Sequence, residues 1–137
     1  MRGERIDGAF ALELAGGGRE RARRVLLATG MEYRPRLERR GLLVPAPLHQ
    51  RSDLAEQLGA ASAEPGPVVV DAVAVDARYG TSAAGVFAAG DVSVQMPQIA
   101  GAIAAGSMAA VMIVQSLTAD DRGLPFPPAP TAALPAS

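Results

Sequence analysis

One carboxylate in this sequence stands where a binding site is expected, because Asp91 separates two apolar segments. Residues 85–91 predict a buried strand that ends abruptly at Gly90-Asp91, and residues 98–117 predict a long helix. Ligands of α/β sheets bind beyond the carboxyl ends of the strands. The N-terminus of the following helix offers free N–H groups and a positive dipole at the same place. Asp91 would therefore accept hydrogen bonds from ligand hydroxyls, although a strand-to-helix connection with a capping Asp explains the pattern about equally well.

The other candidates for chemistry are weaker. Gly16-Gly17-Gly18 joins two expected strands, so a hairpin turn is favoured over a phosphate-binding loop. His49 has Ser52 and Asp53 beside it, but adjacent positions rarely give triad geometry, so we expect His49 in a loop. One histidine and no cysteine predict no metal site, and no catalytic residue is assigned. The remaining acids are expected at turns and on the surface: Asp71, Asp76, Asp120 and Asp121.

Short strands and one short helix should position these residues. Residues 9–15 and 21–28 predict a hairpin around the three glycines. Ser52 is expected to cap a helix that Gly59 ends, with Leu54 and Leu58 on one face. Further segments are predicted from their composition: a buried strand at 41–44, extended chain at 68–70 and 73–76, and a turn at 78–81.

The long helix at 98–117 is expected to be buried against a sheet. Its small residues, among them Gly101, Ala102, Ala105 and Gly106, would let its backbone approach a neighbour or a ligand closely. The apolar stretch 99–114 is shorter than the ~20 residues of a membrane span and has no basic flank, so a membrane helix is disfavoured. Residues 123–137 are rich in Pro and Ala and are expected to be disordered.

Composition narrows the class of protein. Hydrophobic residues make up 49% of the 137 residues but aromatics only 4%, so the core must be aliphatic. The absence of cysteine fits a cytoplasmic location and excludes a disulfide scaffold. Residues 1–40 hold ten Arg against six acids, and residues 41–137 hold three Arg against eight acids. The basic segment could meet phosphates, but a solvated face is favoured, and no nucleic-acid partner is expected at a net charge of −1.

Two segments carry a family resemblance. Residues 81–91, TSAAGVFAAGD, followed by Gln98 and GSMAA at 106–110, resemble the C-terminal FAD motif of the thioredoxin-reductase-like flavoproteins, within the pyridine nucleotide–disulfide oxidoreductases. Residues 24–30, RVLLATG, resemble the A-T-G motif of that family. The stretch 40–59 is similar to its strand and short helix before the last flavin segment. The likeness extends over roughly residues 8–118.

The resemblance implies a cofactor and a set of contacts. Asp91, after Gly90, would hydrogen-bond the ribityl hydroxyls of FAD. The Gln98-Ile99 backbone would face the pyrimidine edge of the flavin ring. Thr29 and Gly30 would lie near the cofactor and the domain hinge.

The same resemblance shows what is missing. Complete members begin with G-x-G-x-x-G/A for the FAD pyrophosphate, and they insert a nicotinamide-nucleotide domain that often carries C-x-x-C. Neither the motif nor a cysteine occurs here. We therefore expect a weak or incomplete FAD site, no NAD(P)H site and no complete catalytic activity. The parent reaction would be hydride transfer from NAD(P)H to FAD and then to a disulfide or another acceptor.

The predicted fold class is α/β, a partial Rossmann-like FAD-binding domain with a small β-hairpin or meander and a long buried C-terminal helix. That domain would span 1–122: the hairpin and A-T-G strand at 1–36, a junction at 37–40 where the NAD(P) domain is missing, and the C-terminal flavin segment at 41–122. The alternative is a non-catalytic remnant or interaction module that forms a homo-oligomer or complements another chain. No membrane partner is expected.

Overall fold

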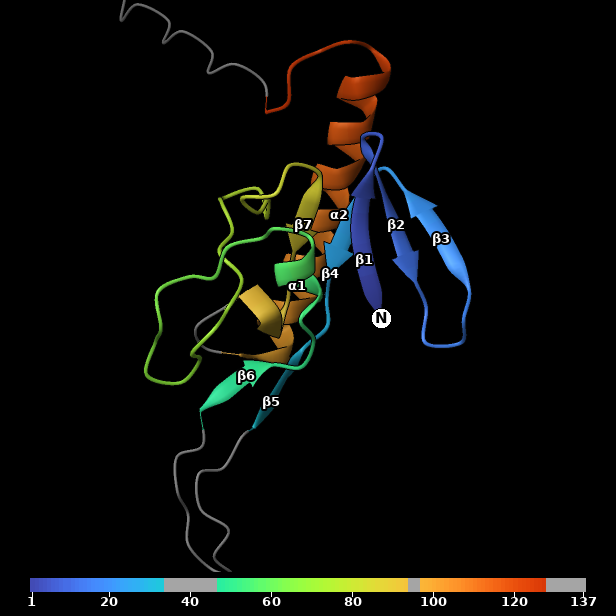
Figure 1. The fold of residues 1–137 in the computed structure, drawn as a ribbon. Coiled ribbons are helices and arrows are strands. Elements are labelled where there is room, and N and C mark those ends of the chain that lie inside the picture. The colour runs from blue at the N-terminus through green and yellow to red at the C-terminus, as the bar shows by residue number, and fades with distance from the viewer. Residues whose placement is uncertain (34–46, 94–96, 128–137) are drawn as a thin grey trace, which may run out of the picture.

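A computed structural model describes residues 1–33, 47–93 and 97–127 of the chain. They form a mixed α/β structure of three small sheets and one long helix (Figure 1). The strands are β1 (Arg2–Ile6), β2 (Ala9–Glu13), β3 (Arg19–Ala22), β4 (Val25–Leu27), β5 (Met31–Tyr33), β6 (Leu48–Gln50) and β7 (Val86–Ala88). The helices are α1 (Leu54–Gln57), the short 3-10 helix η1 (Asp91–Ser93) and α2 (Ile99–Asp121).

The N-terminal sheet is an antiparallel meander in the order β1-β2-β3. The predicted turn at the three glycines is confirmed, with Gly17 at φ 81° between β2 and β3. Strand β1 was not expected from the sequence. Asp7 and Gly8 join it to β2 with φ values of 49° and 76°, as in the tight hairpin turns that Asp-Gly pairs favour. That dipeptide is the sequence signal for β1.

The prediction of one long second hairpin strand at 21–28 is wrong. Only β3 stays in the meander, and β4 leaves it to pair in parallel with β7. The N–H of Val25 donates to the carbonyl of Gly85 (3.1 Å) at the start of this pairing. Val25 and Leu27 are buried, so the apolar end of the segment is drawn into the core while its charged beginning stays at the surface.

The third sheet is the antiparallel pair β5-β6. His49 lies in β6, so the expectation of a loop position is wrong. The extended segments predicted at 68–70 and 73–76 form only isolated bridges, from Val69 to Leu48 and from Val73 to Ser62. The predicted strand at 41–44 and the predicted junction at 37–40 lie outside the described residues.

Helix α1 is confirmed at the predicted place. Leu54 and Leu58 are buried, and Gly59 has a φ of 80°, the left-handed conformation that often ends helices. The cap differs by one residue, because Asp53 precedes the helix without a side-chain capping bond. The hydroxyl of Ser52 still accepts a hydrogen bond from the N–H of Leu54 (3.2 Å). The turn at 78–81 is also confirmed, with the Asp76 carboxylate accepting from the N–H groups of Arg78 and Gly80, both at 2.8 Å.

The main core lies between the meander, the parallel pair and α1. Its buried members are Phe10, Val25, Leu27, Leu54, Ala55, Leu58, Val73, Val86, Ala88 and Val92. One aromatic residue among aliphatic ones agrees with the aliphatic core that the composition predicts.

Helix α2 is not the buried helix that the sequence predicts. Only Ala105, Ala109, Ser116 and Ala119 are buried. The contact with the sheet is a narrow seam in which Ala105 and Ala109 pack against Ala89. The isoleucines on the other side are largely exposed, Ile99 at 83% and Ile103 at 69%. The described residues supply one sheet face for this helix, and nothing in them covers the opposite face.

By length and composition alone, α2 is long and apolar enough to cross a membrane. The helix has 23 residues and only 17% of its most apolar window is buried. Such a helix by itself is weak support for a membrane span. Residues 123–127 of the expected disordered tail follow it with no helix or strand, and the N–H of Leu124 donates to the carbonyl of Ala119 (2.8 Å). The remainder of that tail lies outside the described residues.

Candidate functional site

The carboxyl ends of β4 and β7 define the candidate site. The two strands run in parallel with Leu27 opposite Ala88. One further hydrogen bond follows, from the N–H of Ala89 to the carbonyl of Leu27 (3.1 Å). The segments that follow both strands then line one hollow, the first through Gly30 and the second through Gly90. This is the edge of a parallel sheet where ligands are expected.

Gly90 turns the chain from β7 into η1. Its φ of 80° lies in the left-handed region, which glycine adopts without strain. Its carbonyl accepts hydrogen bonds from the N–H (3.0 Å) and from the hydroxyl (3.1 Å) of Ser93. Asp91 is the first residue of η1 and is half-buried. The turn therefore places Asp91 in the wall of the hollow.

Helix α2 supplies the facing wall through two small residues. Ala102 and Gly106 are one turn apart on the same side of the helix, and both line the hollow. A Cβ atom added to Gly90 would lie 3.7 Å from the Cβ of Ala102. The backbone of the Gly90 turn thus passes close to the helix, as the small residues of the sequence predict.

The hollow has a volume of about 260 Å³. Seven of its eight lining residues are Gly, Ala or Leu, and Asp91 is the one ionisable residue among them. The lining residues are Leu26, Ala28, Gly30, Ala89, Gly90, Asp91, Ala102 and Gly106.

The structure brings together three of the six predicted site residues. Gly30, Gly90 and Asp91 line the hollow, whereas Thr29, Gln98 and Ile99 do not. Gln98 precedes α2 with an extended backbone and no side-chain capping bond, and the Ile99 side chain points largely into solvent. The sequence did not identify Leu26, although its place in the apolar segment before A-T-G was a usable signal.

The residues that line this hollow fit part of a flavin. Apolar and glycine surfaces suit the faces of an aromatic ring, and a carboxylate suits ribityl hydroxyls. The volume lies below the range of about 300–1,000 Å³ that is usual for small-molecule sites. None of the described lining residues is basic. The residues present therefore fit the ring and the sugar alcohol, and they do not supply partners for a pyrophosphate.

A separate polar hollow of about 470 Å³ lies beside α1, lined in part by Gln50 and Asp71. The Asp71 carboxylate accepts from the N–H of Gln50 (2.8 Å) and contacts Nδ1 of His49 (3.2 Å). Asp71 lies in a bend and its side chain is 36% exposed, as expected for an acid at a surface turn, and its carboxylate also joins the end of β6 to the 68–73 segment. The described residues contain no cluster of three or more His, Cys, Asp or Glu side chains suited to a metal ion.

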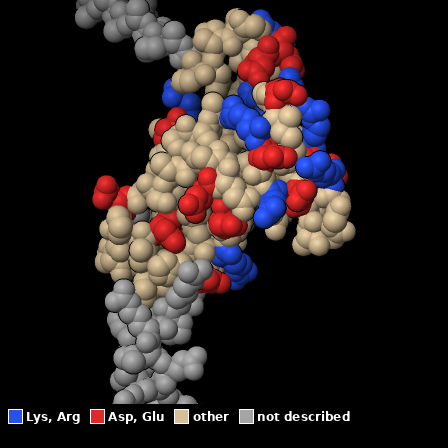
Figure 2. Space-filling model, viewed as in Figure 1, with Lys and Arg blue, Asp and Glu red and all other residues tan. Residues whose placement is uncertain are grey.

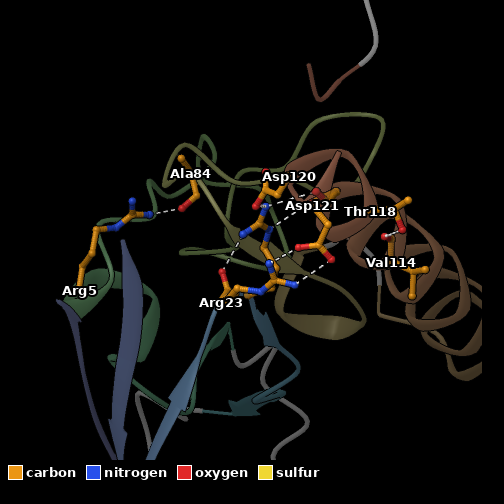
Figure 3. A network of polar contacts seen from close by, with 9 residues as sticks. Arg5, Arg23, Ala84, Val114, Thr118, Asp120 and Asp121 are labelled. Atoms are coloured by element: carbon orange, nitrogen blue, oxygen red, sulfur yellow. Dashed lines mark hydrogen bonds and ion pairs between the residues drawn. The ribbon is translucent and has the colours of Figure 1, made fainter. Parts of the chain in front are cut away.

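The far end of α2 is held by arginines of the β3–β4 connection (Figure 3). Arg24 donates to the carboxylate of Asp120 and to the hydroxyl of the buried Ser116, and Arg23 donates to Asp121 (2.6 Å). The hydrogen bond from Arg23 lowers the pKa of Asp121 and raises that of Arg23. Asp120 and Asp121 are thus ion-pair partners as well as surface residues.

Another arginine of the basic segment, Arg19, is also paired with acids. Arg19 lies 3.4 Å from Glu4 and 3.5 Å from Glu13 on the meander. Figure 2 shows basic and acidic side chains interspersed over this sheet. Such a mixed surface agrees with the solvated face that the sequence favoured over a phosphate-binding strip.

Comparisons with known proteins identify a solved structure of similar fold but no relative by sequence. No protein-family profile matches the chain, and no curated protein sequence matches it. Among solved structures, the oxidoreductase from Agrobacterium tumefaciens is similar with a TM-score of 0.73 at 18% identity, over 85% of this chain and 72% of that one. The chain shares the fold of an oxidoreductase.

Proposed function

We propose that this chain is the FAD-binding part of a thioredoxin-reductase-like, NAD(P)H-dependent oxidoreductase, with a Rossmann-like sheet at its centre, acting in the cytoplasm. The observation that carries the proposal is the meeting of Gly30 and Gly90-Asp91 in one hollow at the ends of β4 and β7. These residues are 60 positions apart in the chain and belong to the two segments that resemble the family's flavin motifs. The likeness to a solved oxidoreductase supports the same proposal.

The residues of the hollow would bind and orient the cofactor. The Asp91 carboxylate would accept hydrogen bonds from two ribityl hydroxyls, and Gly90 would let the ligand lie close to the backbone. Ala102 and Gly106 leave room beside the ring because they carry no side chain beyond Cβ. Bound FAD would supply the hydride chemistry, accepting from NAD(P)H and donating to a disulfide or another acceptor. The chain has no cysteine to form a dithiol of its own.

Flavin titration tests this proposal. We expect saturable but weak quenching of flavin fluorescence when the protein is added to FAD or to riboflavin, and a weakening of about tenfold or more in Asp91→Ala. Absence of saturable binding for both ligands would overturn the proposal. We also expect no NADPH consumption with a chromogenic disulfide as the acceptor, because the sequence contains no cysteine and no G-x-G-x-x-G/A motif.

The exposed face of α2 favours a second candidate, an interaction module that associates with another copy or with a complementing chain. No charged residue occurs from Ile99 to Ala119, and Ile99, Ile103 and Val114 are more than half exposed. Contiguous exposed apolar surface of this kind marks interaction sites. A sedimentation experiment that gives a monomer at all concentrations would count against self-association. No nucleic-acid or membrane partner is proposed.

A further inference from the structure

Helix α2 presents a continuous stripe of uncharged, mostly apolar side chains on the side opposite its contact with the sheet. Ala105 and Ala109 pack against Ala89, and the side chains on the other side of the helix are exposed. Five of these exposed positions follow one another at alternating spacings of three and four residues: Ala100, Ile103, Ser107, Ala110 and Val114. Two helices that pack side by side meet along such a row.

This stripe has large residues toward its ends and small residues at its centre. Ile103 is 69% exposed and Val114 is 62% exposed, and Ser107 and Ala110 lie between them. Two antiparallel copies of α2 would place Ile103 of each copy against Val114 of the other, with Ser107 against Ala110 at the centre. Each contact then occurs twice, which is the self-complementarity that a two-fold dimer requires.

An apolar hollow of about 390 Å³ lies beside the C-terminal end of the stripe. It is lined by Val114, Gln115, Thr118, Ala119, Leu124, Pro125 and Phe126. In the antiparallel register, Ile99 of the second copy lies opposite Thr118 and reaches this hollow. Ile99 is 83% exposed. A parallel pair would instead place Ile99 against Ile99 and leave the hollow open, so the hollow favours the antiparallel pair.

The charges of α2 favour the same arrangement. No residue from Ile99 to Ala119 is charged, so two copies of the stripe bring no like charges together. The acids that follow, Asp120 and Asp121, are paired with Arg24 and Arg23 of the same copy. Antiparallel pairing also places the positive end of each helix dipole beside the negative end of the other.

We propose that the exposed face of α2 binds a second copy of this chain in an antiparallel two-fold pair. In this pair Ile103 packs on Val114, and Ile99 enters the hollow beside Phe126. The inference rests on the second candidate function above, for which it specifies the partner and the geometry. It does not depend on the flavin site, which α2 lines through Ala102 and Gly106.

The size of the contact predicts the strength of the dimer. A helix of 23 residues is about 35 Å long and about 10 Å wide. The pair therefore covers on the order of several hundred Å² on each copy, toward the low end of specific interfaces. We expect a dimer that dissociates on dilution.

Disulfide trapping tests the proposal, because the chain contains no cysteine of its own. Ile103→Cys and Val114→Cys are prepared as two proteins, mixed and mildly oxidised, and mass spectrometry separates the three possible dimers. In the antiparallel pair, residue 103 of one copy and residue 103 of the other lie about 16 Å apart along the helices, too far for a disulfide. We expect the mixed disulfide to form at least about fivefold faster than either symmetric one. Glu20→Cys, on an exposed position of β3, is the control and should cross-link with neither.

Sedimentation velocity over a concentration series provides the second readout. The dimer fraction of the parent protein should rise with concentration, and Ile99→Gln should weaken the dimer about tenfold while circular dichroism remains unchanged. Faster formation of the symmetric disulfides would indicate a parallel pair and overturn the inference. A monomer at every concentration would overturn both the inference and self-association as a function. Flotation with phosphatidylcholine vesicles in the absence of the mixed disulfide would assign the face to a lipid surface and likewise overturn the inference. None of these results would change the flavin titration.

Discussion

Arg24 and Asp120, 96 residues apart in the chain, form an ion pair that fastens the last turn of α2 to the start of β4. The Arg24 side chain is only 15% exposed, and its Nε also donates to the hydroxyl of Ser116. Ser116 is the one buried polar residue of the described core. The contact therefore satisfies a buried hydroxyl in addition to pairing two charges.

Replacing Arg24 should cost more stability than replacing its neighbour Arg23. We expect Arg24→Ala to lower the free energy of unfolding by about 1–3 kcal/mol, because the Ser116 hydroxyl loses its donor in a buried place. Arg23→Ala removes an exposed pair, in which both side chains are more than half accessible, and should therefore cost clearly less. Urea unfolding of the two variants measures the difference. Equal losses of unfolding free energy in the two variants would show that the buried Ser116 hydroxyl does not need Arg24 as its donor.

The stability of the protein should depend on pH through Asp121. The Arg23 hydrogen bond lowers the folded-state pKa of Asp121 from its ordinary value of 3.8. A lowered folded pKa stabilises the protein above the unfolded pKa, and this contribution is lost as the pH falls through the folded pKa. We expect Asp121→Asn to unfold at a lower temperature than the parent protein at pH 6, and the difference to shrink as the pH falls below 3.8. Thermal melts across this range measure the effect, and a difference that does not shrink with falling pH would contradict the assignment.

Two glycines of the candidate site should respond to alanine in opposite directions. Gly90 has a φ of 80°, so Gly90→Ala should destabilise the protein by about 1–3 kcal/mol through backbone strain. The added Cβ would lie in ordinary contact with Ala102, at 3.7 Å. Gly106 lies inside α2 with open space around its Cβ position. Gly106→Ala should therefore stabilise the helix by about 0.5–1 kcal/mol.

Denaturant midpoints of these two variants provide the check. Circular dichroism at low denaturant serves as the control that both keep the parent helix content. A Gly90→Ala variant as stable as the parent protein would mean that the left-handed turn before Asp91 is not retained.

The exposed face of α2 should govern self-association. Ile103→Gln replaces a side chain that is 69% exposed, so it should change the free energy of unfolding by less than about 0.5 kcal/mol. If the face binds a second copy, the same variant should shift the sedimentation profile toward monomer. Glu20→Gln, on an exposed position of β3, is the control and should leave association unchanged. An identical oligomer distribution in Ile103→Gln would place the contact elsewhere.

The local sequence pattern was sufficient to predict much of the fold. The Gly turn after β2, the helix between Ser52 and Gly59, the turn at Asp76 and the start of α2 after Gln98 all depend on residues close together in the chain. Glycines and turn acids specify backbone conformation locally. The Gly90-Asp91 step was placed at a strand end for the same reason, and the structure has it there.

Tertiary structure decided the rest. The departure of β4 from the meander, the pairing of Asp71 with His49 and the link from Arg24 to Asp120 join segments that are far apart in sequence. The exposure of α2 is the clearest case. An apolar sequence indicates that burial of the helix is favourable. Only the arrangement of the other elements determines how much of their surface is available to cover the helix. In the described residues that surface is the narrow seam of Ala89, Ala105 and Ala109.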